Sequence, residues 1–230
     1  MGVVYLLRHG QASFGAADYD VLSETGRLQA ERAGRALAAR AGRLDLVVSG
    51  SLRRQRDTAA LALAGFPGAP PCTDDRAWDE YDHLDVLQAV DPALRDRAGI
   101  ASRLAREERP REAFKELFER ALERWTSGLH DADYRESLGA FLTRVEAGLE
   151  RVLATLHPSG TALVVTSGGP IAAVCHDLLR LPPARAFEVA GALVNGGFTK
   201  LVASPRGVRL STLNEHGHLE EPGRTLVTYR

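Results

Sequence analysis

Cysteine and long apolar runs are scarce in this 230-residue sequence. Only Cys72 and Cys175 occur, which are too few for a disulfide framework, and no spacing of cysteine and histidine matches a zinc site. No stretch approaches the roughly 18 apolar residues of a membrane span, and the first residues lack the basic and apolar segments of a secretion signal. The sequence therefore predicts a cytoplasmic protein with reduced thiols, no metal and no membrane partner.

An excess of charge of either sign is also missing. The 29 basic and 30 acidic residues give a net charge of -1, so no global field attracts nucleic acid, and we expect no nucleic-acid partner. The 44% hydrophobic content is sufficient for a sizeable core. We expect a single domain over residues 1–230, and the sequence leaves open whether the chain is a monomer or a homodimer.

Short apolar runs predict the strands of an α/β sheet. Residues 3–7, 44–48 and 162–166 are rich in valine and leucine and are bounded by polar residues and glycine, which is typical of buried parallel strands. Helical patterns follow each of them, over residues 23–42, 52–64 and 168–179, and residues 198–202 and 208–213 predict a closing hairpin.

The middle of the chain has a different pattern. From about residue 86 to residue 157 the apolar periodicity is helical, and no segment is convincing as a strand. The clearest helices lie near 111–125 and 137–156, and Pro92, Pro110 and Gly128 interrupt the pattern. This block predicts a helical insertion into the α/β domain.

Polar segments that contain glycine follow three of the predicted strands. Because the carboxyl ends of parallel strands meet at one edge of a sheet, we expect the three segments to share one crevice. Arg8 supplies a fork of donors that suits phosphate, and His9 supplies a nitrogen that is neutral and nucleophilic near pH 7. Two of the segments lead into helix N-termini, which attract anions. The segments are Arg8-His9-Gly10, Ser49-Gly50-Ser51 and Ser167-Gly168-Gly169.

Three arginines follow the second of these segments. Arg53, Arg54 and Arg56 lie in the first turns of the helix predicted over 52–64. Successive residues point about 100° apart around a helix, so at most one or two of them can face the crevice. We expect Arg53 and Arg56 to form a solvated basic face.

The motif Leu7-Arg8-His9-Gly10, the segment from Ser49 to Ala59 and the acidic cluster over 78–83 resemble the histidine phosphatase superfamily, the phosphoglycerate-mutase-like proteins. The resemblance covers most of the chain. It implies a three-layer α/β/α fold with a mainly parallel sheet and a helical insertion. Matched residue by residue, it implies that Arg8 and Arg54 bind phosphate, that His9 is the nucleophile and that Glu80 is the general acid.

Two positions depart from the pattern of that family. Ser167 stands where the family normally has a second histidine, and Gly15 stands where many members carry a polar residue. Gln11 and Ser13 are the nearby substitutes for the latter. His83, three residues after Glu80, either reaches the pocket and partly replaces the missing histidine or is an ordinary loop histidine.

The resemblance implies a phosphatase that acts on a small phosphorylated substrate through a phosphohistidine on His9. Arg8, Arg54 and the N–H groups near Gly168 would hold the phosphoryl oxygens, with Ser167 beside them, and no cofactor is required. Two alternatives remain at this point. One is a degenerate phosphate-binding or regulatory protein without turnover. The other is a phosphoglycerate-type phosphomutase, although the sequence lacks the extra basic segments that such an enzyme uses.

Overall fold

The computed structural model describes residues 1–13, 20–221 and 224–229. A six-stranded sheet runs through the centre of the molecule in the order β3-β2-β4-β1-β5-β6. Strands β1 to β4 are parallel, β5 runs antiparallel to β1, and β6 runs antiparallel to β5. The mainly parallel sheet with a closing hairpin is therefore confirmed. The strands span Gly2–Arg8 (β1), Leu46–Ser49 (β2), Cys72–Asp74 (β3), Thr161–Thr166 (β4), Phe198–Ser204 (β5) and Gly207–Glu215 (β6).

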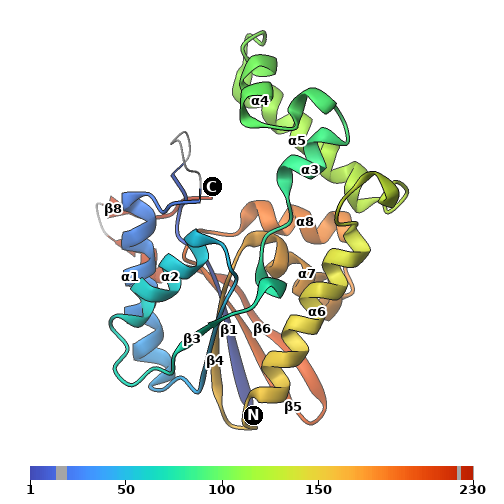
Figure 1. Ribbon diagram of the computed structural model, residues 1–230. Helices are drawn as coiled ribbons and strands as arrows, with labels where there is room; N and C mark the ends of the chain where they lie inside the picture. Colours follow the sequence, from blue (N-terminus) through green and yellow to red (C-terminus); the bar gives the residue numbers. More distant parts are fainter. Residues whose placement is uncertain (14–19, 222–223, 230) are drawn as a thin grey trace.

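Helices cover both faces of the sheet and complete the three layers (Figure 1). Successive side chains of a strand point to opposite faces, so Tyr5 and Leu7 of β1 pack with α1 and α2, whereas Val4 and Leu6 pack with α6 and α7. Each fully buried side chain of this size contributes about 1.5–3 kcal/mol to folding. The four helices span Glu24–Ala41 (α1), Arg53–Leu63 (α2), Leu138–Thr155 (α6) and Gly168–Leu179 (α7).

The helical insertion rises beyond the sheet edge at the carboxyl end of β1 (Figure 1). Its helices are α3 (His83–Gln88), α4 (Arg97–Leu104) and α5 (Pro110–Thr126). Helix α6, which also lies within the predicted block, instead packs on the sheet, where Val145 and Val152 share a core with Val4. The helices predicted near 111–125 and 137–156 begin and end within a residue of α5 and α6.

The sequence analysis missed β3, the two-residue strands at the end of the chain and the helix α8 (Pro183–Ala192), which packs against α7. Four short 3₁₀ turns and a two-stranded pair complete the described chain. The turns span Arg76–Trp78, Pro92–Leu94, Asp131–Asp133 and Gly217–Leu219, and the pair consists of β7 (Glu220–Glu221) and β8 (Arg224–Thr225).

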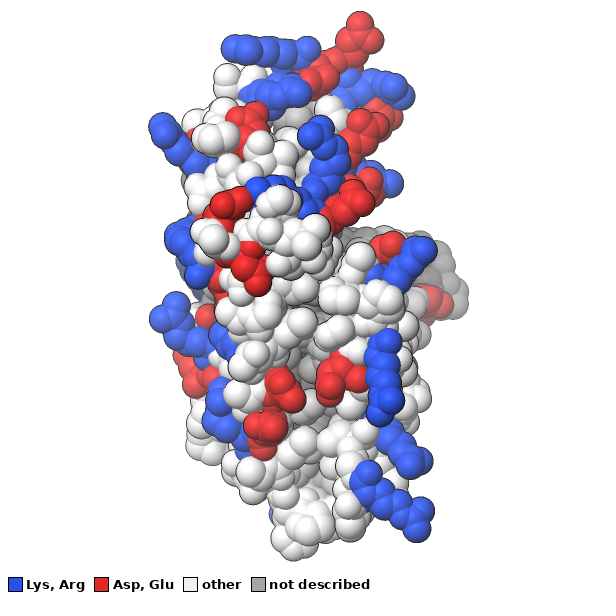
Figure 2. All heavy atoms as spheres, turned by 90° about the vertical axis from the view of Figure 1, so that its right-hand side faces the viewer, with Lys and Arg blue, Asp and Glu red and all other residues white. Residues whose placement is uncertain are grey.

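Acidic and basic side chains are intermingled on the face shown in Figure 2, most densely over its upper part. Exposed ion pairs at α5 are Arg109–Glu112 at 3.3 Å, which starts from the residue before the helix, and Lys115–Glu119 at 3.7 Å. Within the described part of the chain, no helix has both the length and the apolar character needed to cross a bilayer.

Candidate active site

Three neighbouring strands end at one edge of the sheet and bring the three polar segments together. The amide of His9, directly after β1, donates to the Thr166 carbonyl at the end of β4 at 2.8 Å. The amide of Gly50, directly after β2, donates to the Val165 carbonyl at 3.0 Å. The segments that begin at Arg8, Ser49 and Ser167 therefore lie side by side, because β4 is hydrogen-bonded to both β1 and β2.

His9 is buried and its ring is held by one hydrogen bond on each nitrogen. Nδ1 lies 2.7 Å from the Gly10 carbonyl oxygen, which can only accept, so Nδ1 carries the hydrogen. Nε2 then presents its lone pair and accepts from Nε of Arg54 at 3.1 Å. Burial, followed by the charges of Arg54 and Arg8, lowers the pKa of His9 well below 6.5. The lowered pKa favours the neutral imidazole at physiological pH, with its lone pair on Nε2.

Only one of the three arginines of α2 faces this edge. Arg54 is buried beside His9, whereas Arg53 and Arg56 are exposed and pair with Asp57 at 3.6 Å and Asp74 at 3.5 Å. The predicted solvated face of Arg53 and Arg56 is confirmed. Arg8 is also buried, and its Nη1 donates to the carbonyl of Leu193.

Asp20, which the sequence analysis did not single out, holds the guanidinium of Arg54 from the other side. Its Oδ1 accepts from Nη1 of Arg54 at 2.7 Å, and its Oδ2 accepts from the Arg53 amide at 2.7 Å. The carboxylate thus also satisfies a free N–H at the N-terminus of α2. The only signal in the sequence is an acidic residue before the first helix, and its partner lies more than thirty residues away.

Two further buried polar residues fix the backbone around His9. Thr58 of α2 accepts from the Gly10 amide at 3.1 Å and donates to the Arg54 carbonyl at 2.7 Å, which ties α2 to the loop after β1. Asn195 donates from Nδ2 to the His9 carbonyl at 3.3 Å. Thr58 lies within the segment from Ser49 to Ala59 that carries the resemblance, whereas Asn195 belongs to no motif identified in the sequence.

Glu80 lies over the N-terminus of α7. Both of its carboxylate oxygens accept from the Gly169 amide, at 3.1 and 3.2 Å. Burial raises the pKa of Glu80, although the Gly169 hydrogen bond and the charges of Arg54 and Arg8 oppose this shift. Because the two arginines act on the pKa values of both His9 and Glu80, the two groups share one electrostatic environment.

Ser167 is the last residue before α7 and is fully buried. Its hydroxyl oxygen accepts from Nε2 of Gln55 at 2.8 Å. The next residue, Gly168, lies against Arg8, because a Cβ built at Gly168 would be 3.8 Å from Nε of Arg8. The structure thus brings Ser167 and Gly168 to the same strand edge as His9 and Arg8.

The remaining predicted site residues lie around this centre. Gln11 accepts from the Ser23 hydroxyl at 2.8 Å at the start of α1, and the amide of Ser13 donates to the Val21 carbonyl at 2.7 Å. His83 is the first residue of α3 and is partly buried. Roles for these three residues stay predictions, and Gly15 lies outside the described residues.

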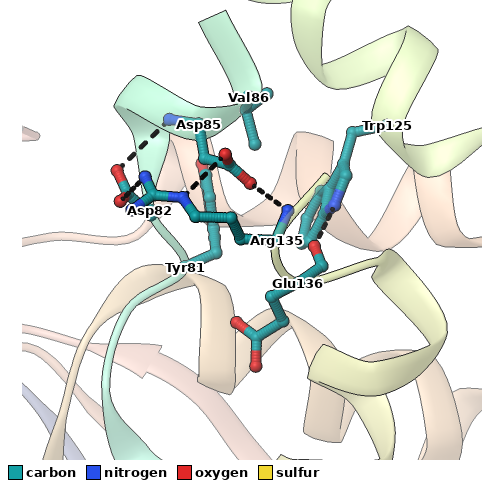
Figure 3. Close-up of a pocket in the computed structure, with 7 residues that line it drawn as sticks. All are labelled: Tyr81, Asp82, Asp85, Val86, Trp125, Arg135 and Glu136. Atoms are coloured by element: carbon teal, nitrogen blue, oxygen red, sulfur yellow. Dashed lines mark hydrogen bonds and ion pairs between the residues drawn. The ribbon is translucent and has the colours of Figure 1, made fainter. Parts of the chain in front are cut away.

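A cavity of about 160 Å³ lies between α3, α5 and the segment before α6 (Figure 3). Arg135 crosses it and donates to Asp85 at 2.9 Å and to Asp82 at 2.6 Å, and Nε1 of Trp125 donates to the Glu136 carbonyl at 3.0 Å. Tyr81, which follows Glu80, also lines it. The cavity therefore lies in the helical insertion, and the residue next to Glu80 in the chain forms part of its wall.

Residues 1–13, 20–221 and 224–229 contain no group of three or more histidine, cysteine or acidic side chains placed to hold a metal ion. The positive charge of the site comes from Arg8 and Arg54, which are both buried.

Comparison with known proteins gives a consistent result. The family model of the histidine phosphatase superfamily (branch 1) matches residues 4–98 and 88–216. A mycobacterial glucosyl-3-phosphoglycerate phosphatase, solved with inorganic phosphate, is 25% identical over 95% of this chain and 99% of its own, with a TM-score of 0.59. No protein of curated function matches the chain.

Two more distant structures share the fold. YhfR of Bacillus stearothermophilus is 19% identical over 96% of this chain and 100% of its own, with a TM-score of 0.65. A mutant phosphoserine phosphatase from Entamoeba histolytica, in complex with phosphoserine, is 17% identical over 96% of this chain and 100% of its own, with a TM-score of 0.64. The three-layer architecture with its helical insertion is thus that of known solved structures.

Proposed function

Because this chain belongs to the histidine phosphatase superfamily, we propose that it is a phosphatase that hydrolyses a small phosphomonoester through a phosphohistidine on His9. One observation carries the proposal. The Gly10 carbonyl fixes the hydrogen of His9 on Nδ1 and leaves the lone pair of Nε2 facing the Arg54 guanidinium, where an anionic phosphoryl group would be held.

In the first step Nε2 of His9 attacks phosphorus. The N–P bond forms as the bond to the leaving oxygen breaks, and Glu80, whose raised pKa favours its protonated form, gives its proton to that oxygen. Nε of Arg54 passes from the His9 lone pair to a phosphoryl oxygen, and Arg8 binds another.

In the second step the Glu80 carboxylate takes a proton from water, and the oxygen of that water attacks the phosphohistidine. The N–P bond breaks, inorganic phosphate leaves and His9 returns to its neutral form. The amide of Gly169 keeps the carboxylate in place through both steps. The chain supplies the nucleophile, the acid and base and the positive charge from its own residues.

The test is a brief incubation with radiolabelled p-nitrophenyl phosphate followed by denaturation. We expect label that is stable to base and lost in acid, as a phosphoramidate is. His9→Ala should fold, lose the label and lose turnover, whereas His130→Ala, which changes an exposed histidine, should keep both. Undiminished turnover in His9→Ala contradicts the proposal.

The same assay separates the two alternative functions. Label that forms but is released only onto a second phosphorylated acceptor identifies a phosphomutase, and phosphate binding without label identifies a binding protein. A panel of phosphorylated metabolites with phosphate release as readout addresses the substrate. Phosphoserine and glucosyl-3-phosphoglycerate come first in it, since proteins of similar structure are named for them.

A further inference from the structure

Ser167 occupies the position beside the nucleophile at the edge of the sheet. Arg8 and Thr166 are aligned partners of β1 and β4, so the residues that follow them, His9 and Ser167, lie next to each other. Ser167 is fully buried, and its hydroxyl does not cap the helix that it precedes. A buried hydroxyl at this place needs hydrogen-bond partners, because leaving a buried donor or acceptor unpaired is costly.

Gln55 of α2 satisfies the acceptor side of that hydroxyl. Gln55 is fully buried, and its Nε2 donates one hydrogen to Oγ of Ser167 at 2.8 Å and the other to the Trp78 carbonyl at 2.9 Å. Its Oε1 accepts from the Leu52 amide at 3.2 Å. A flipped amide would face a carbonyl with its oxygen and an N–H with its NH₂ group, so the backbone fixes which atom of Gln55 points at Ser167.

This orientation decides where the hydrogen of Ser167 goes. Because Oγ already accepts from Gln55, its own O–H must point in another direction. Among the described residues, no hydrogen bond that this hydroxyl donates is found. A buried donor without an acceptor costs free energy, and Ser167 is fully buried. The neighbouring groups are the neutral His9 and the cations of Arg8 and Arg54, which together attract an anionic oxygen.

We propose that Gln55 is a positioning residue that holds Ser167 as a hydrogen-bond donor to the phosphoryl group attacked by His9. The inference rests on the proposed phosphatase function and extends it to a residue for which the sequence analysis predicted no role. Together the two side chains form a neutral donor unit, Gln55–Ser167, beside the nucleophile. Since neither member titrates between pH 4 and 10, the unit adds no ionisation to the pH dependence of turnover.

The test is a double-mutant cycle on kcat and KM for p-nitrophenyl phosphate. Ser167→Ala removes the donor, and Gln55→Met keeps the length of the side chain but removes its hydrogen bonds. We expect each to lower kcat about tenfold with a smaller change in KM, which is the scale of one neutral hydrogen bond made in the transition state. If Gln55 acts only through Ser167, Gln55→Met should change kcat less than twofold when Ser167→Ala is already present.

Gln55→Glu provides a second arm that preserves shape and is used for the cycle if Gln55→Met does not fold. A carboxylate accepts where the amide donates, so it turns the Ser167 hydroxyl toward itself, and we expect kcat as low as in Ser167→Ala. Gln88→Met is the matched control, since Gln88 donates to Asp85 in α3, and its kcat should stay within twofold.

Two outcomes overturn the inference. The first is that the fold-losses in kcat of Ser167→Ala and Gln55→Met multiply in the double variant. This result is expected if Gln55 has an independent structural role. The other is wild-type kcat in Gln55→Glu. Failure of the proposed function gives a different result. Full turnover in His9→Ala would contradict the phosphohistidine mechanism, and the double-mutant cycle between Gln55 and Ser167 could still be measured on that activity.

Discussion

At the scale of single residues, the charges of Arg8 and Arg54 lower the pKa values of both His9 and Glu80, which favours neutral His9 but opposes the protonated form of Glu80. Their charges help burial to lower the pKa of His9 well below 6.5, and they only partly offset the burial that raises the pKa of Glu80 above 4.5. The proposed mechanism requires neutral His9 and protonated Glu80. We therefore expect turnover to fall on the acid side as His9 gains a proton and on the basic side as Glu80 loses one.

Arg54→Ala tests this arrangement. Loss of a preorganised charged donor should lower kcat/KM on the order of 10²- to 10³-fold. Because the Arg54 charge lowers the pKa of His9, its removal should also move the acid limb of the kcat/KM profile to higher pH. The measurement is kcat/KM for p-nitrophenyl phosphate between pH 4 and 9 in the wild type and the variant.

Arg53→Ala and Arg56→Ala are the matched controls for Arg54→Ala, since both side chains are exposed on the other face of α2. Each should leave kcat/KM within about twofold of the wild type and the acid limb where it was. Equal losses in all three variants would mean that the charge of the helix as a whole, and not the contact with His9, is responsible.

The sequence predicted those residues of the site that belong to a compact motif. Arg8, His9 and Gly10 are consecutive, and the period of a helix limits the arginines that can face the crevice to one or two, from which the family resemblance selects Arg54. Asp20 and Gln55 escaped detection for a physical reason. Each acts through a partner far away in the chain, and a glutamine in the first turn of a helix has the same local pattern whether it contacts solvent or Ser167.

At the scale of elements, the N-terminus of α7 depends on the close approach of Glu80. A Cβ at Gly169 would lie 2.0 Å from Oε1 of Glu80 and 2.8 Å from the Tyr81 ring, so only glycine allows the carboxylate to reach the amide. Gly169→Ala should displace Glu80 and lower kcat by about 10²-fold, which is the lower end of the range for loss of general acid–base catalysis. Steady-state kinetics of the purified variant measure this.

Gly191→Ala is the control for that substitution. Gly191 lies in the last turn of α8, and a Cβ there would meet no atom within 4 Å. It should leave kcat unchanged and stabilise the protein by about 0.4–1 kcal/mol through the unfolded chain. A Gly169→Ala enzyme with normal kcat would show that the contact between Glu80 and α7 is dispensable for turnover.

The elements that the sequence predicted are those with a buried face of their own. Strands β1 and β4 consist almost wholly of buried apolar residues, and α6 has a regular apolar stripe. In β3 all three residues are exposed and only backbone pairing with β2 defines the strand. In α8 only Ala186 and Phe187 are buried, and the helix begins at the second of two consecutive prolines, so neither element has a periodic signal.

At the scale of the whole molecule, the insertion divides into two parts with different roles. Helix α6 belongs to the layer that covers the sheet, whereas α3 to α5 extend beyond the edge that holds His9 (Figure 1). Arg135 joins these parts, because it lies just before α6 and binds Asp82 and Asp85 at the start of α3 (Figure 3). The rings of Tyr81 and Trp125, which line the same cavity, pack at a tilt with their centroids 4.9 Å apart. The contact is thus placed to fix the position of α3 to α5 relative to the sheet edge that holds His9.

Asp85→Asn should loosen this junction in a pH-dependent way. Burial disfavours the charge of Asp85, but hydrogen bonds from the side chain and backbone of Arg135 outweigh it and lower the pKa of Asp85 below 3.8. A carboxyl whose pKa is lower in the folded than in the unfolded protein stabilises the fold above the unfolded value, and this contribution is lost as the pH falls through the folded value.

We therefore expect Asp85→Asn to reduce the free energy of unfolding by about 1–2 kcal/mol at pH 7, the scale of a hydrogen bond to a charged group with a solvent-exposed partner. Urea unfolding from pH 7 down to pH 3 should show a constant difference from the wild type down to about pH 5, which then shrinks below about pH 4. Glu188→Gln, which breaks the exposed Arg185–Glu188 pair, should cost at most about 0.5 kcal/mol. A difference for Asp85→Asn that persists unchanged at pH 3 would assign its cost to packing of the amide and not to the ionised carboxylate that anchors the insertion.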